Sequence, residues 1–165
     1  MGEVSAGAPS SRGLPGRVLG IDLGSVRIGV ALSDPTRTVA SPHAVLPRSG
    51  SDHGADHRAI VEMAGAEAVT TIVVGLPLSL SGATGPAALA AEAEIEELRS
   101  LVGADVEVVA HDERLTTVTA ERSLGAARMS RARRREVVDK VAAAVMLQSW
   151  LDQSGSGQSW SEPPR

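Results

Sequence analysis

The feature that most constrains this chain is a carboxylate, Asp22, inside an apolar run that extends over residues 17–23. That run has the length and the branched apolar residues of a buried strand. A second apolar run follows over residues 26–34, and Gly24 and Ser25 between the two are typical of a tight turn. The folded part of the chain is therefore expected to open with a β-hairpin that carries an acid on its first strand.

Three interpretations of Asp22 are open. A carboxylate in a buried strand is costly unless it is paired, hydrogen-bonded or bound to a metal. Asp-x-Gly at the end of a strand can also be ordinary turn chemistry. The segment over residues 20–25 further matches the phosphate-binding hairpin of actin-like kinases and ATPases. Such enzymes need two domains of this kind, whereas 165 residues suffice for one, so the length weakens the phosphotransferase interpretation.

Composition narrows the class of protein. The net charge of −4 does not by itself indicate a nucleic-acid partner, and the absence of cysteine excludes disulfides and thiolate metal sites. The first residues lack the basic start and the apolar core of a signal peptide, and no apolar stretch approaches the length of a membrane span. We expect a soluble, cytoplasmic protein with no membrane partner and an aliphatic core.

The order of predicted elements indicates an α/β fold in one domain. A disordered N-terminal arm is expected over residues 1–15, the folded domain over 16–152 and a disordered C-terminal tail over 153–165. After the hairpin, the patterns predict a strand at 39–46 interrupted at Pro42, a helix at 55–65, a strand at 70–75, a loop at 76–85, a helix at 86–101, a strand at 106–110, a helix at 116–127 and a helix from 130 to about 151. Antiparallel strands followed by βα units predict a mixed sheet with helices on both faces.

A second candidate for chemistry is the segment at residues 111–117, which contains two acids, follows a predicted strand and opens a predicted helix. The carboxyl ends of strands are where α/β folds place ligands. Acids at this position can also serve only to stabilise the N-terminus of the helix. The local sequence does not distinguish Asp112 from Glu113 as the functional acid.

A third candidate is Asp139, inside the apolar part of the last predicted helix. Ala142, Ala143 and Met146 lie on the same side of that helix. Small residues there would let the helix press close to the sheet and aim Asp139 at its active edge, whereas an exposed acid beside Lys140 is the simpler interpretation. If the three acids converge, their hard oxygen ligands would select Mg²⁺ or Mn²⁺, and two ions roughly 4 Å apart could activate a water for phosphodiester cleavage.

Four segments that span about residues 17–152 can now be taken together. They are residues 20–34 (GIDLGSVRIGVALSD), 73–78 (VVGLPL) with Gly82 and Gly85-Pro86, 112–117 (DERLTT), and 139–143 (DKVAA) with 147–152 (LQSWLD). With these segments in this order, the chain resembles the YqgF/RuvX family of RNase H-like nucleases. The resemblance implies an RNase H-like fold, in which a five-stranded mixed sheet has its first three strands antiparallel. It also implies a Mg²⁺-dependent endonuclease that processes the 5′ end of pre-16S rRNA in ribosome biogenesis.

The resemblance also assigns the acids. The family's three acidic positions fall on Asp22, Glu113 and Asp139, which favours Glu113 over Asp112 on resemblance alone. Asp22 would bridge two metal ions, and Glu113 and Asp139 would each complete the coordination of one ion. Asp34 or Asp112 could assist as a fourth carboxylate.

Arginines are concentrated where the last predicted helix begins, at Arg128, Arg131, Arg133, Arg134 and Arg135. Their guanidinium groups suit phosphate oxygens, although a solvated helix start would look the same. Arg27 and Arg114 stand beside the proposed acids and could orient the scissile phosphate or form salt bridges. Because the chain has no Phe or Tyr, base stacking is not expected to be the main contact, and binding should depend strongly on salt.

Several questions stay open at the level of sequence. The nucleic acid could be precursor rRNA, or branched DNA if the protein is a Holliday junction resolvase, and the protein could be a monomer or a homodimer. A resolvase would need a dimer to cut two opposed strands. A non-catalytic nucleic-acid-binding transcription factor is a third possibility. His53 and His57 could share a metal on a helix, but no third ligand is evident and an exposed pair is expected.

Overall fold

The computed structural model describes residues 16–79, 81–112 and 130–155. Its elements are β1 (Arg17–Leu23), β2 (Arg27–Ser33), β3 (Ala40–Pro47), α1 (His53–Ala66), β4 (Val69–Leu76), α2 (Pro86–Leu101), β5 (Glu107–Asp112) and α4 (Arg131–Gly155). The strands form one sheet in the order β3-β2-β1-β4-β5. Strands β1, β2 and β3 pair antiparallel, whereas β4 pairs parallel with both β1 and β5. The predicted mixed sheet with three antiparallel strands is confirmed.

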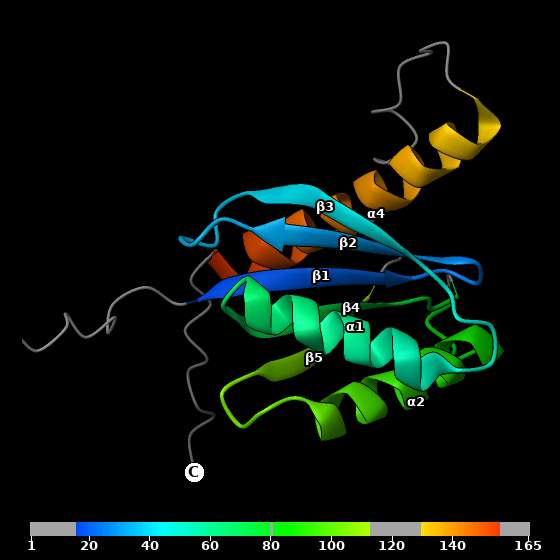
Figure 1. Ribbon diagram of the computed structural model, residues 1–165, viewed down its shortest axis with the longest axis horizontal. Helices are drawn as coiled ribbons and strands as arrows, with labels where there is room; N and C mark the ends of the chain where they lie inside the picture. Colours follow the sequence, from blue (N-terminus) through cyan, green and yellow to red (C-terminus); the bar gives the residue numbers. More distant parts are fainter. Residues whose placement is uncertain (1–15, 80, 113–129, 156–165) are drawn as a thin grey trace, which may run out of the picture.

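Helices cover both faces of this sheet (Figure 1). Helices α1 and α2 pack on one face, and α4 crosses the other and projects past the sheet at its N-terminal end. Side chains of β1 alternate between the two faces: Leu19 belongs to the core with Ile60 of α1 and Leu98 of α2, and Val18 belongs to the core with Leu147 of α4. We call these the α1/α2 face and the α4 face.

Helix α4 approaches the sheet closely because two strand residues opposite it are glycines. A Cβ atom placed on Gly20 would lie 2.8 Å from Cβ of Leu147. A Cβ atom placed on Gly29 would overlap the backbone carbonyl oxygen of Asp139 and lie 3.3 Å from Cβ of Ala143. Glycine in a strand interior often marks such a close backbone approach. The predicted close contact between the small residues of α4 and the sheet is therefore confirmed.

Several element boundaries differ from the prediction. Strand β3 continues through Pro42, with a register shift opposite Val30 and Ala31. Proline is tolerated there because β3 is an edge strand. Helix α4 ends at Gly155 rather than near residue 151. The predicted helix at 116–127 and the predicted arm at 1–15 lie outside the described residues, as does residue 156 onward of the predicted tail.

No helix within the described ranges has both the length and the apolar character needed to cross a membrane.

Candidate active site

The structure brings Asp22 and Asp139 to the same place. Asp22 stands near the end of β1, where its register partner on β2 is Gly29. Alternation along β1 puts Asp22 on the α4 face, together with Val18. Gly29 lies directly against the backbone of Asp139, which belongs to α4. Two of the three predicted acids, far apart in sequence, therefore lie on the same face of the sheet, and each of them adjoins Gly29.

Asp139 forms an ion pair with Arg27, the first residue of β2. The Arg27 Nε donates to Oδ2 of Asp139 at 2.6 Å, and both side chains are about 30% exposed. An ion pair with this exposure contributes little to stability, because solvent screens it. Its effect is geometric, since Arg27 fixes the direction in which the Asp139 carboxylate points.

The carboxylate oxygens of Asp22 and Asp139 are chemically suited to bind a divalent cation. Asp22 and Asp139 supply hard carboxylate oxygens of the kind that Mg²⁺ and Mn²⁺ prefer, and the Asp139 carboxylate already faces a cationic group, the guanidinium of Arg27. Over the part of the chain that the structure describes, no group of three His, Cys, Asp or Glu residues is placed to hold a metal ion. The third predicted ligand, Glu113, lies outside the described residues and stays a prediction.

Neither predicted fourth carboxylate joins Asp22 on the α4 face. Asp112 ends β5 opposite Leu76, and alternation from Val108 puts it on the α1/α2 face. Asp34 lies at the opposite end of the sheet, where it accepts hydrogen bonds from the backbone N–H groups of Thr38 at 2.7 Å and Val39 at 2.8 Å.

Asp34 therefore closes the turn between β2 and β3. A hydrogen bond from the Thr36 hydroxyl and further bonds from the backbone of Val39, Thr38 and Thr36 lower the pKa of this carboxyl well below its usual range. The possibility that Asp34 assists as a fourth carboxylate finds no support here, because Asp34 and Asp22 lie at opposite ends of the β1–β2 pair, separated by the length of the strand.

The α4 face also holds a buried histidine, to which the sequence analysis assigns no function of its own. His111 of β5 is 9% exposed, and its Nε2 lies 3.4 Å from the Ser149 hydroxyl of α4. Burial lowers the pKa of His111, and the charge of Asp112 opposes that shift. Alternation along residues 107–112 was the sequence signal for its inward orientation.

The arginines at the start of α4 lie on the part of the helix that projects beyond the sheet (Figure 1). Those that the structure describes are all exposed: Arg131, Arg133, Arg134 and Arg135. Arg114 and Arg128 lie outside the described residues. Exposed guanidinium groups on a projecting helix end are available to a phosphate backbone.

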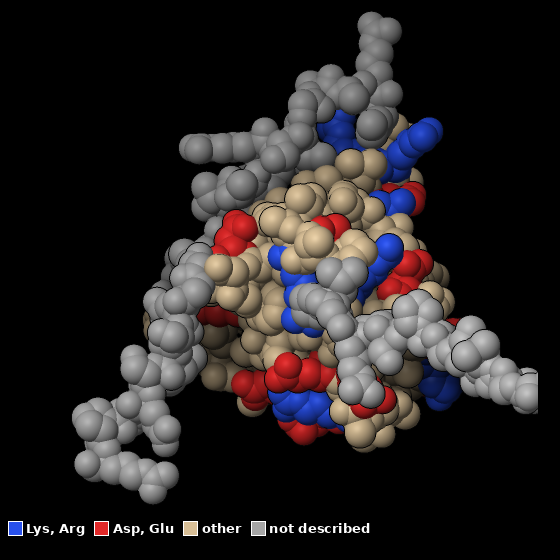
Figure 2. All heavy atoms as spheres, turned by 90° about the vertical axis from the view of Figure 1, so that its left-hand side faces the viewer, with Lys and Arg blue, Asp and Glu red and all other residues tan. Residues whose placement is uncertain are grey.

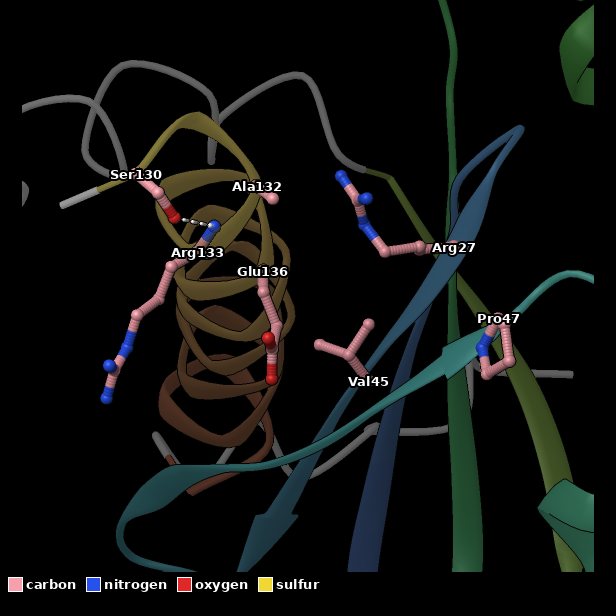
Figure 3. Close-up of a pocket in the computed structure, with 7 residues that line it drawn as sticks. All are labelled: Arg27, Val45, Pro47, Ser130, Ala132, Arg133 and Glu136. Atoms are coloured by element: carbon pink, nitrogen blue, oxygen red, sulfur yellow. Dashed lines mark hydrogen bonds between the residues drawn. The ribbon is translucent and has the colours of Figure 1, made fainter.

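A hollow of about 720 Å³ separates the start of α4 from strands β2 and β3, and its lining includes Arg27, Val45, Ser130, Arg133 and Glu136. Figure 3 shows Arg27 extending from β2 toward the first turns of α4, whereas the Arg133 side chain points away from the hollow. Arg27 therefore connects this hollow with Asp139, to which it is bound.

The opposite end of the molecule has a different surface. Viewed from the side where β1 begins, acidic and basic side chains lie in small mixed groups (Figure 2). This view shows no single basic field among the described residues, which agrees with the net charge of −4.

The expectation of an exposed histidine pair was wrong for one member. His57 is completely buried, and its Nε2 lies 2.9 Å from Oε2 of Glu94. His53 keeps a side chain that is 46% exposed. The partner that allows His57 to be buried is on α2, 37 residues away in sequence.

Comparison with known proteins identifies the family. A family profile described as RuvX, Holliday junction resolvase, matches residues 16–153. The chain belongs to the RuvX family. It is 43% identical to a "Putative pre-16S rRNA nuclease" of Roseiflexus sp. over 84% of this chain and 95% of that protein. A protein of the same name from Halalkalibacterium halodurans is 42% identical over 82% of this chain and 96% of that protein.

A solved structure supports the fold alone. The fowlpox virus resolvase, crystallised with Holliday junction DNA, aligns with a TM-score of 0.51 at 8% identity. The alignment covers 84% of this chain and 98% of that chain. The RuvX sheet and its flanking helices are thus an RNase H-like resolvase fold, as the sequence predicts.

Proposed function

We propose that this RuvX protein is a metal-dependent endonuclease, a hydrolase of phosphodiester bonds, that processes the 5′ end of pre-16S rRNA. The observation that carries the proposal is that Asp22 and Asp139 both adjoin Gly29 on the α4 face, with Arg27 bound to Asp139. The names of relatives that are more than 40% identical over most of the chain support rRNA as the substrate. Ribosome biogenesis agrees with the expected cytoplasmic location.

Each site residue has a proposed role. Asp22, Glu113 and Asp139 would hold two Mg²⁺ ions, with Mn²⁺ as a substitute, and Asp22 would contact both. Ions bound there would supply an activated water and stabilisation of the leaving oxygen. Arg27 holds the Asp139 carboxylate in a fixed direction, and its remaining guanidinium N–H groups can orient a phosphate.

Substrate contact is assigned to the arginines of α4 together with Arg27, Arg114 and Arg128. The described members lie on the projecting end of α4 and beside the hollow that leads to Asp139. Contacts of this kind bind phosphates without reading bases, so we expect recognition of backbone and shape. The protein would act as a monomer or a homodimer.

A second candidate function is cleavage of branched DNA. The description of the family as a Holliday junction resolvase favours it. A resolvase must present two sites to opposed strands, so this function requires the homodimer. A nucleic-acid-binding factor without catalysis is disfavoured, because such a factor needs no pair of carboxylates at the sheet.

The test is cleavage of a precursor rRNA 5′ leader and of a four-way DNA junction, side by side, with Mg²⁺. Asp22→Asn should abolish cleavage of the true substrate while the protein stays folded, and Asp34→Asn is the matched control at the other end of the sheet. We expect the rRNA leader to be cut and the junction to be left intact. Cleavage of the junction alone would favour the resolvase, and activity retained by Asp22→Asn would contradict the assigned site.

A further inference from the structure

A cluster of buried charged side chains lies on the α1/α2 face, on the other side of the sheet from Asp139. Its members are Arg48, which directly follows β3, Asp56 and His57 of α1, and Glu94 of α2. Their side chains are 9%, 2%, 0% and 9% exposed, respectively. Buried charges are expensive unless they are paired, so this cluster needs an explanation beyond packing.

Arg48 is the centre of the cluster and is held by both helices. Its two terminal nitrogens donate to the two carboxylate oxygens of Glu94 at 2.8 and 3.0 Å. One of them also donates to Asp56 at 3.4 Å, and the backbone N–H of Ser49 donates to the other oxygen of Asp56 at 3.0 Å. A bidentate arginine–carboxylate pair fixes direction as well as distance. The guanidinium therefore has one position relative to α1 and α2.

The third nitrogen of Arg48 reaches the hairpin turn. Its Nε donates to the carbonyl oxygen of Gly24 at 2.9 Å. The backbone N–H of Arg48 donates to the carbonyl oxygen of Val26 at 3.0 Å. The turn between β1 and β2 is thus held by two hydrogen bonds from one residue, which is itself anchored in the helical layer.

The turn between β1 and β2 links Asp22 to Arg27, the residue that binds Asp139. On one side, the N–H of Gly24 donates to the carbonyl oxygen of Asp22 at 3.1 Å. On the other side, the chain enters β2 at Arg27, which is bound to Asp139. The turn is also tight, because a Cβ atom on Gly24 would overlap the carbonyl oxygen of Arg27. A displacement of the turn would therefore move Asp22 and Arg27 together.

We propose that Arg48 is a positioning residue of the nuclease site, which it serves by fixing the Gly24 turn, and with it Asp22 and Arg27, to helices α1 and α2. The proposal rests on the proposed nuclease function. It explains why a buried arginine stands beneath a turn that could otherwise be closed by backbone hydrogen bonds alone. Arg48 touches neither substrate nor Asp139 in this role.

The chain offers a matched control at the other end of β1. Arg37 donates from Nε to the carbonyl oxygen of Gly16 at 2.9 Å, and from Nη2 to the hydroxyls of Thr70 at 2.8 Å and Thr71 at 3.2 Å. Arg37 and Arg48 therefore make the same bond to a glycine that flanks β1. Only Arg48 makes it at the end that carries Asp22.

The experiment compares Arg48→Met, the double variant Arg48→Met/Glu94→Leu, and Arg37→Met with the wild-type chain. The double variant removes Arg48 together with its bidentate partner, so the Glu94 carboxylate is not left buried without a cation, and it does not restore the bond to Gly24. Asp56 loses its bond to Arg48 in both variants and keeps the bond from the backbone N–H of Ser49. For each folded variant we would measure the cleavage rate, the Mg²⁺ concentration that gives half-maximal rate, and the unfolding midpoint. Affinity for Mn²⁺, measured by electron paramagnetic resonance, tests the site without a substrate.

We expect both Arg48 variants to cleave on the order of tenfold to a hundredfold more slowly, because small misplacements of reacting groups have effects of this size. Both should need several-fold more Mg²⁺ and bind Mn²⁺ more weakly, even after the double variant regains stability. Arg37→Met should be less stable and keep the wild-type Mg²⁺ requirement. If Arg48→Met alone does not fold, the double variant decides the result.

Two results would overturn the positioning role: cleavage and Mn²⁺ affinity that recover together with stability in the double variant, or an Arg37→Met variant with the same raised Mg²⁺ requirement. A wild-type chain that cuts neither substrate contradicts the proposed function instead, and the Mn²⁺ affinities then still test the position of Asp22. If the wild-type chain and Arg48→Met cleave the substrate equally well, the role of Arg48 is contradicted and the proposed function is not.

Discussion

The two faces of the sheet are packed in different ways. On the α1/α2 face, large aliphatic side chains interdigitate, and Ile21 of β1, Ile60 of α1 and Leu98 of α2 are all fully buried or nearly so. On the α4 face, the residues opposite the helix near Asp22 are glycines, and the helix contributes small residues such as Ala143.

The difference shows how one small domain builds its main aliphatic core on one face of the sheet and places two carboxylates on the other. Interdigitated aliphatic side chains bury the apolar area that stabilises the fold. Glycine and alanine bury less area but let a helix backbone approach a strand, and that approach is what brings Asp139 to Asp22. Near Asp22, the α4 face therefore buries less apolar area, and its small residues allow the two carboxylates to be placed on one face.

The largest expected change in stability comes from truncating the α1/α2 face. Ile60→Ala removes a fully buried side chain and should lower the free energy of unfolding by about 2–5 kcal/mol. Cleavage by the protein that remains folded should be unchanged, because Ile60 packs in the aliphatic core away from Asp22 and is not one of the residues that bind Arg48. Urea unfolding together with the cleavage rate at low temperature measures both quantities. A large fall in the cleavage rate of the folded protein would show that the aliphatic core of the α1/α2 face also positions the site.

A smaller loss of stability, with a larger effect on chemistry, is expected from Gly29→Ala on the α4 face. The added methyl group would overlap the Asp139 carbonyl, and overpacking of this kind costs about 1–3 kcal/mol. Because the helix must shift, cleavage should fall further than the folded fraction does.

The matched control is Gly65→Ala in α1, where an added Cβ meets nothing within 4 Å. It should be neutral or stabilising by up to about 1 kcal/mol, because alanine is the better helix former. Equal behaviour of the two glycine variants in unfolding and cleavage assays would show that α4 does not pack as described.

The α1/α2 face should also make the fold sensitive to acid. Burial by itself would raise the pKa of Glu94, but hydrogen bonds from Arg48 and His57 and the charge of Arg48 outweigh it and lower that pKa. The pKa of Asp56 is lowered in the same way, since hydrogen bonds from Ser49 and Arg48 outweigh its burial. A carboxyl with a lowered folded pKa stabilises the protein above its unfolded value of about 4, and this contribution is lost as pH falls further.

Unfolding free energies between about pH 3 and about pH 7 measure this dependence. The variant Arg48→Met/Glu94→Leu lacks one of the two carboxyls and should lose less stability over the acidic range than the wild-type chain. An equal loss would mean that the acid sensitivity comes from elsewhere in the molecule.

The smallest expected effect concerns the exposed arginines of α4. Replacing Arg133 or Arg134 with Ala should weaken nucleic-acid binding and reduce the slope of log affinity against log salt by about 0.7–0.9 for each phosphate that the variant no longer neutralises. Arg58 on α1, with a side chain that is 67% exposed, is the control on the other face. If Arg58→Ala changes the slope as much as the α4 variants do, then binding is not confined to the α4 side.

Much of this architecture could be predicted because it depends on local patterns. The β1–β2 hairpin follows from two apolar runs around Gly24, and the close approach of α4 follows from the small residues beside Asp139. The buried side of α4 is harder to predict: Val137 and Val141 are only half-buried, whereas Ala143, Leu147 and Leu151 belong to the core. A run of Val and Ala has apolar residues on several sides, so the sequence alone does not fix the face.

Two residues that the sequence analysis misplaced or did not single out depend on distant partners. His57 looks like a surface histidine until Glu94, on another helix, is brought next to it. Arg48 has no local feature that sets it apart from other arginines, and its role depends on Gly24, which is 24 residues away. Asp34 is a different case, because its partners Thr38 and Val39 are local and the predicted hairpin already places it at the end of β2 away from Asp22.

The measurement that tests the account most directly is Mn²⁺ binding, followed by electron paramagnetic resonance, for the wild-type chain, Asp22→Asn, Asp139→Asn and Asp34→Asn. If Asp22 and Asp139 form one metal site on the α4 face, each of their variants should lose more than the roughly tenfold in affinity that removal of a supporting group costs. Asp34→Asn, at the far end of the sheet, should bind Mn²⁺ as the wild-type chain does. Wild-type affinity in both the Asp22 and the Asp139 variant would contradict the account.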